Sequence, residues 1–134
     1  MAIEAEKTDE NRNSVSVCLD TMLGLEGVVL NTRIQLNQGK GPYEILQNGL
    51  SDYLVLDLTG CCLDAILFYV NQDIPVMAML EDGNAVLVVG FNETQIVIMD
   101  PENGSLSKRS MKESEEWFEE NGNSFITYVR TGQE

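Results

Sequence analysis

Three side chains in this sequence could take part in nucleophilic chemistry: the thiol of Cys18, the amide of Asn84 and the carboxylate of Asp100. Cys18 begins a stretch with helical spacing, and a helix N-terminus stabilises a thiolate through its unpaired backbone amides. Asn84 and Asp100 lie at the two ends of an apolar run typical of a strand hairpin, so we expect them to lie close together. The simpler alternative is that Cys18 only packs in a core and that the other two are turn formers.

The absence of histidine restricts this chemistry. Imidazole is the usual general base beside a cysteine nucleophile and the commonest metal ligand, yet the 134 residues contain none. The three cysteines are Cys18 and the adjacent Cys61 and Cys62. An odd number with two neighbours predicts no disulfide framework, and without histidine it predicts no zinc site. We therefore expect no metal and no cofactor, and exclude any mechanism that needs an imidazole from this chain.

The net charge restricts the class of partner. Eight basic residues against 22 acidic ones give a net charge of −14, which argues against nucleic acid and anionic membrane surfaces. This charge is compatible with a cationic partner, although a solvated acidic surface is the simpler interpretation. No apolar run approaches the roughly 18 residues of a membrane span. The polar, acidic N-terminus does not resemble a secretory signal.

The elements that would position these side chains follow from the apolar spacing. Residues 1–13 are charged and predict a flexible N-terminal arm, residues 14–130 a single folded domain and residues 131–134 a tail. We expect helices at 18–25, 32–38, 42–50, 61–70 and 111–121, and strands at 52–58, 74–80, 83–91, 95–100, 105–110 and 124–129. Ser16 is the expected N-cap of the first helix. The order predicts an α+β domain with N-terminal helices packed on a C-terminal antiparallel sheet.

The order of these features resembles that of a papain-like cysteine peptidase, with the nucleophile on the first long helix and the base before a later strand. Residues 83–91 together with Met99-Asp100-Pro101 resemble, more narrowly, the bacteriocin-leader (double-glycine) peptidase-like branch. That branch typically has a glycine-histidine pair, an apolar run, a glycine-aromatic pair and an aspartate-proline pair. The resemblance implies a papain-like fold over residues 14–130. It also implies that Cys18, Asn84 and Asp100 take the nucleophile, base and orienting-carboxylate positions.

Two departures from the family pattern concern the chemistry. Asn84 stands where the family has its histidine, and asparagine has no titratable nitrogen that could take a proton from a thiol. The family usually has an oxyanion-donating glutamine upstream of the nucleophile, and Asn13 is this chain's candidate for that role. Loss of the base removes the activation of the nucleophile and typically several orders of magnitude of rate.

These departures predict a catalytically degenerate peptidase-like domain that binds a peptide or protein partner of cationic character, with Cys18, Asn84 and Asp100 at vestigial positions. One alternative is an active thiol hydrolase in which Cys18 works with an unconventional base. Another is a structural or interaction module of a larger bacterial surface or secreted protein. The compartment and the oligomeric state stay open. A contact between the Cys18 sulfur and the Asn84 side chain would support the assignment of the site.

Overall fold

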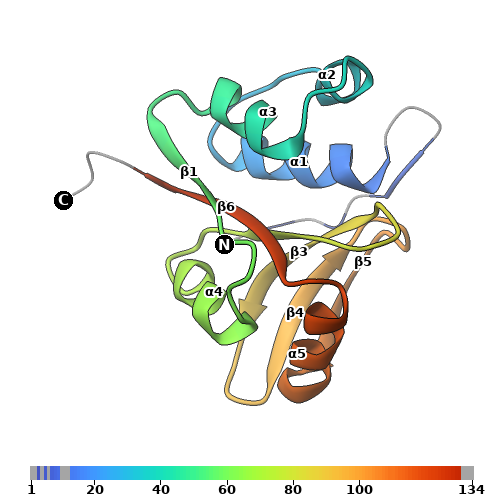
Figure 1. The fold of residues 1–134 in the computed structure, drawn as a ribbon, viewed down its shortest axis with the longest axis vertical. Coiled ribbons are helices and arrows are strands. Elements are labelled where there is room, and N and C mark those ends of the chain that lie inside the picture. Colours follow the sequence, from blue (N-terminus) through green and yellow to red (C-terminus); the bar gives the residue numbers. More distant parts are fainter. Residues whose placement is uncertain (1–2, 4, 6, 10–12, 131–134) are drawn as a thin grey trace.

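The structure, a computed structural model, describes residues 3, 5, 7–9 and 13–130. A sheet with the strand order β1-β6-β2-β3-β4-β5 crosses the centre of the molecule, and every neighbouring pair is antiparallel (Figure 1). The predicted tail at 131–134 lies outside the described residues, as do residues 1–2, 4, 6 and 10–12 of the predicted arm. Helices and sheet together confirm the predicted α+β class.

Each expected helix and strand is present within the described residues. The helices are α1 (Ser14–Leu25), α2 (Thr32–Asn37), α3 (Pro42–Gly49), α4 (Leu63–Val70) and α5 (Met111–Glu120). The strands are β1 (Tyr53–Asp57), β2 (Val76–Met79), β3 (Ala85–Phe91), β4 (Gln95–Asp100), β5 (Ser105–Ser110) and β6 (Ser124–Arg130).

The start of α1 differs from the prediction. The helix begins at Ser14, and its N-cap is Asn13, whose side-chain oxygen accepts a hydrogen bond of 2.9 Å from the backbone amide of Ser16. The expectation that Ser16 caps the helix is therefore wrong. Val15 and Val17 favour extended backbone on their own. Both are buried in the core, and this packing outweighs their local preference.

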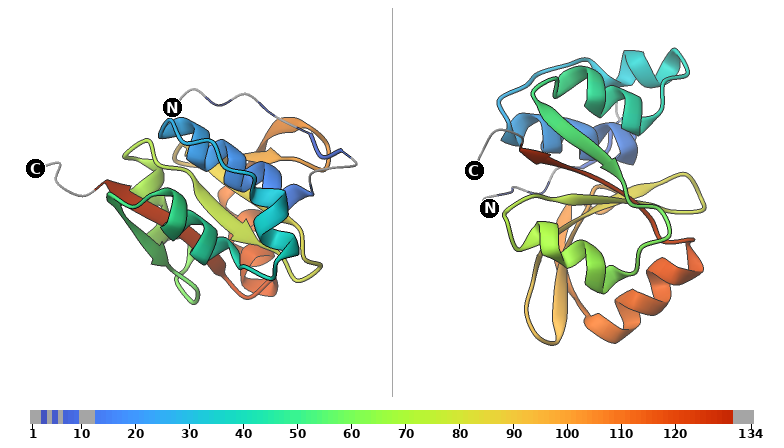
Figure 2. Two further views of the ribbon diagram at one scale, coloured as in Figure 1. Left: turned by 90° about the horizontal axis from the view of Figure 1, so that it is seen from above. Right: turned by 60° about the vertical axis from the view of Figure 1, so that its left-hand side comes forward.

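The sheet separates two hydrophobic cores. On β3, Ala85 and Leu87 pack in the core beneath α1 and α3, while Val86 and Val88 pack in the core beneath α4 and α5. Figure 2 shows the same division from other directions, with α1, α2 and α3 on one side of the sheet and α4 and α5 on the other. The continuous apolar run of β3 thus reflects a strand that is buried on both faces.

The hairpin of β3 and β4 has the turn that the sequence predicts. The side-chain oxygen of Asn92 accepts hydrogen bonds from the backbone amides of Thr94 and Gln95, at 2.9 and 2.8 Å. Because the two strands are antiparallel, the start of β3 and the end of β4 lie at the same end of the hairpin. This arrangement brings the segments that carry Asn84 and Asp100 to one end of the sheet.

The end of α1 is fixed to the sheet by one carboxylate. Glu26 follows the helix, and its side chain, 5% exposed, accepts hydrogen bonds from Tyr53, Tyr128 and Arg130. The distances are 3.0 Å from the Tyr53 hydroxyl, 2.7 Å from the Tyr128 hydroxyl, and 3.0 and 2.7 Å from Nε and Nη2 of Arg130. These four residues, called the Glu26 cluster below, join α1 to β1 and β6.

The described residues of the predicted arm contact the domain. The backbone amide of Thr8 donates a 3.0 Å hydrogen bond to the carbonyl oxygen of Pro101. Ile3 and Ala5 are partly buried and pack against the core beneath α1. These points of the arm therefore lie against the α1 side of the domain and the end of β4.

Candidate functional site

Ser14 joins the N-terminus of α1 to the start of β3. Its hydroxyl donates a 3.0 Å hydrogen bond to the side-chain oxygen of Asn84 and accepts one of 2.9 Å from the backbone amide of Ala85. Ser14 is the first helical residue and is 0% exposed. Ser14 was not among the residues that the sequence predicted for the site. The signal that could have found it is a hydroxyl directly after Asn13, since asparagine is a favoured N-cap.

Asn84 is held from both ends of its amide. Its oxygen faces Ser14, while its nitrogen donates to the Asp82 carboxylate at 3.2 Å. The backbone amide of Asn84 donates to the other oxygen of the same carboxylate at 2.9 Å. An amide in these two contacts is an acceptor and a donor but not a base, because neither atom titrates near neutral pH.

Cys18 lies one helical turn beyond Ser14 and is a core residue. It is 0% exposed and packs in the cluster between α1 and the sheet. Because α1 begins at Ser14, Cys18 is not in the first turn, and that expectation is wrong. Burial raises the pKa of the thiol, and the negative charge of Asp100 raises it further. The thiol is therefore neutral at physiological pH and lacks the features of an activated nucleophile.

The carboxylate of Asp100 accepts hydrogen bonds within the turn that follows β4. Its Oδ1 accepts a 3.0 Å hydrogen bond from the backbone amide of Glu102, and its Oδ2 accepts one of 2.9 Å from the side chain of Asn103. The structure thus brings Ser14 and Asn84 into direct contact, while both carboxylate oxygens of Asp100 bond to its own turn. This arrangement matches the turn-forming alternative for Asp100.

Asn13 has a structural role at the start of α1. Its side-chain oxygen caps the helix through the Ser16 amide, and the residue is otherwise exposed. A role for its amide nitrogen at an oxyanion stays a prediction. Within the described residues, no three Cys, Asp or Glu side chains are grouped so that they could hold a metal ion.

The comparisons with known proteins bear on the fold. No family model matches this sequence, and no curated protein does either. The structure is similar to the crystal structure of a protein from Bacillus anthracis described as a C39-like peptidase, with a TM-score of 0.78 and 15% sequence identity. The match covers 95% of this chain and 94% of the other. The chain has a C39-like peptidase fold. The predicted papain-like arrangement is therefore confirmed.

Across residues 13–130 and the described part of the arm, no helix has the length and apolar character that crossing a bilayer requires.

The three cysteines are expected to differ sharply in reactivity. Cys62, the exposed N-cap of α4, should be alkylated by iodoacetamide in the native protein, and the partly exposed Cys61 more slowly. Cys18 should react only after unfolding, because its thiol is buried and neutral. Peptide mapping by mass spectrometry with and without guanidinium measures the order. Native labelling of Cys18 as fast as that of Cys62 would contradict the assignment of Cys18 to the core.

Proposed function

We propose that this chain is a non-catalytic member of the peptidase-like fold that binds a peptide or protein segment without cleaving it. The observation that carries the proposal is the hydrogen bond between Ser14 and Asn84. It joins the start of the first long helix to the residue before β3, which are the places where the resemblance to papain-like peptidases expects a nucleophile and a base. In this proposal Ser14, rather than Cys18, stands at the nucleophile position.

The chemistry of this pair supports the absence of catalysis. A serine hydroxyl is a weak nucleophile unless an adjacent base accepts its proton. Asn84 cannot be that base, and the sequence offers no histidine to replace it. The Ser14 oxygen is also buried and already bonded to Asn84 and to the backbone amide of Ala85. The hydrogen-bonded pair therefore connects α1 to β3, and the Ser14 oxygen is not accessible to a substrate carbonyl.

The alternative of an active thiol hydrolase has less support. Cys18 is fully buried, and its pKa is raised rather than lowered. A catalytic cysteine needs the opposite: a depressed thiol pKa and partial exposure. Binding without cleavage agrees with both the retained fold and the altered pair, and the net charge of −14 favours cationic peptides.

Incubation of the protein with ten-residue peptides of basic, neutral apolar and acidic composition tests this function. Fluorescence anisotropy measures binding, and mass spectrometry of the same mixtures detects cleavage. We expect saturable binding of basic peptides, weaker binding of acidic ones, and no cleavage products. Products that vanish in Ser14→Ala or Cys18→Ala would overturn the non-catalytic assignment. A lack of saturable binding for every peptide class would overturn the binding function.

A further inference from the structure

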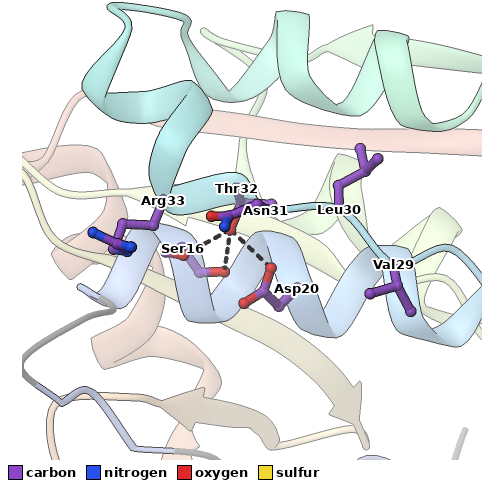
Figure 3. Close-up of a pocket in the computed structure, with 7 residues that line it drawn as sticks. All are labelled: Ser16, Asp20, Val29, Leu30, Asn31, Thr32 and Arg33. Carbon is purple, nitrogen blue, oxygen red and sulfur yellow. Dashed lines mark hydrogen bonds between the residues drawn. The ribbon is translucent and has the colours of Figure 1, made fainter.

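A groove runs along the side of α1 that faces away from Ser14 and Cys18. Residues 16, 20 and 24 are four apart and share one side of the helix, with the irregular segment 28–31 beside them (Figure 3). Two adjoining pockets of about 400 and about 260 Å³ form the groove and share Asp20, Val29 and Leu30. We call it the α1 groove. Its further lining residues are Ser16, Gly24, Val28, Asn31, Thr32 and Arg33.

The carboxylate of Asp20 is oriented by two buried hydroxyls. Thr32 Oγ1 donates to Asp20 Oδ1 at 2.8 Å and lies 2.6 Å from Ser16 Oγ (Figure 3). A hydroxyl has a single proton, so the Thr32 bond to Asp20 makes Ser16 the donor to Thr32. Ser16 and Thr32 are each 1% exposed. The direction of the carboxylate is therefore fixed before any ligand arrives, which lowers the ordering cost of binding.

The opposite wall of the groove is apolar. Val29 is 93% exposed, so its side chain is open to contact with an apolar group of a ligand. Among the described residues, no backbone hydrogen bond joins Val29 or Leu30 to another residue. Unpaired N–H and C=O groups beside alternating side chains are what an extended peptide uses when it adds to a protein edge.

We propose that the α1 groove binds an extended peptide and that Asp20 pairs with a lysine side chain of that peptide. This inference rests on the proposed function and places the peptide on the side of α1 away from the Ser14–Asn84 pair. The peptide backbone lies along residues 29–30, apolar neighbours of the lysine cover Val29, and the ammonium group reaches the Asp20 carboxylate. Arg33 lines one end of the groove and disfavours a second cation there, so the groove selects a single basic residue with apolar neighbours.

A titration followed by ¹⁵N–¹H NMR tests the inference with the capped tripeptide acetyl-Val-Lys-Val-amide. We expect saturable shifts at the amides of Ser16, Asp20, Val29 and Thr32. The same peptide with norleucine in place of lysine should bind about tenfold more weakly, because it lacks the charge-assisted hydrogen bond. Asp20→Asn keeps an oxygen for the Thr32 hydroxyl and removes the charge, so the fold should persist while affinity for the lysine peptide also falls about tenfold.

Two further variants keep the test decisive. Glu116→Gln removes the same charge from α5, on the other side of the sheet, and should leave the affinity unchanged. Val29→Ser alters an exposed side chain without a packing role and should weaken binding of both peptides about threefold.

The outcomes separate this inference from the function on which it rests. Equal weakening by Asp20→Asn and Glu116→Gln would show general charge attraction and overturn the Asp20 pairing, as would equal affinity for the norleucine peptide. Binding of basic peptides with shifts confined to other surfaces would overturn the α1 groove while leaving the peptide-binding function in place. Failure of every peptide class to bind would overturn both.

Discussion

Replacement of Glu26 by glutamine is expected to lower the free energy of unfolding by about 2–4 kcal/mol at neutral pH, since Arg130 loses its charge partner and the tyrosine and guanidinium donors lose one acceptor oxygen. The Glu26 side chain is 5% exposed and accepts hydrogen bonds from two tyrosine hydroxyls and from Arg130. Glutamine keeps one acceptor oxygen and places an NH₂ group where a donor already points. Arg130, whose side chain is 27% exposed, would lose its charge partner.

Urea unfolding followed by the fluorescence of Trp117 measures this loss. Glu115→Gln, an exposed change of the same kind on α5, is the matched control and should stay within about 0.5 kcal/mol of the parent. Tyr53→Phe removes one donor and should destabilise the protein less than Glu26→Gln does. A Glu26→Gln protein as stable as the parent would contradict the central role of the Glu26 cluster.

The same carboxylate gives stability a defined pH dependence. Burial acts to raise the pKa of Glu26, but the hydrogen bonds from Arg130, Tyr128 and Tyr53 outweigh it and lower the pKa below its ordinary value. A carboxyl with a lowered pKa in the folded state stabilises the fold above its unfolded pKa of about 4.3. This contribution is lost as the pH falls from that value through the folded pKa. The fall in stability below about pH 4.3 should therefore be shallower in Glu26→Gln.

The pair Ser14→Cys and Asn84→His is expected to create a thiol with a strongly depressed pKa. Ser14 Oγ lies 3.0 Å from the Asn84 side chain, so an imidazole at this position would meet the new thiol. A thiolate paired with an imidazolium at a helix N-terminus has a pKa of roughly 3.5–7.5, against about 8.5 for a free cysteine. Ser14→Cys alone should titrate above that free value, because its site is buried.

Ultraviolet absorbance of the thiolate, followed against pH, measures this shift without requiring a reagent to reach a buried site. Cys61→Ser and Cys62→Ser should be present throughout, and Cys18→Ala should leave the result unchanged. A double variant that titrates like Ser14→Cys alone would contradict the assignment of positions 14 and 84. If Asn84→His alone depressed the pKa of Cys18, the nucleophile position would belong to Cys18 instead.

The fold was largely predictable because its signals are local. The apolar run of residues 85–89 and the turn at Asn92 follow from short-range patterns, and the structure has them where expected. The Glu26 cluster was not predictable, since it joins residues up to 104 positions apart. The first helix was predicted to begin at Cys18 rather than at Ser14, because Val15 and Val17 favour strands until a core is available to bury them.

The composition by itself determined that this chain has no imidazole base, because no fold of a sequence without histidine can place an imidazole in a site. The sequence also placed a polar amide before an apolar hairpin, where the family resemblance expects histidine. Only the tertiary structure decided which residue of the first helix meets that amide. Burial of Val15 and Val17 allows the helix to begin at Ser14. With this start, the Ser14 side chain faces Asn84 and Cys18 lies in the core.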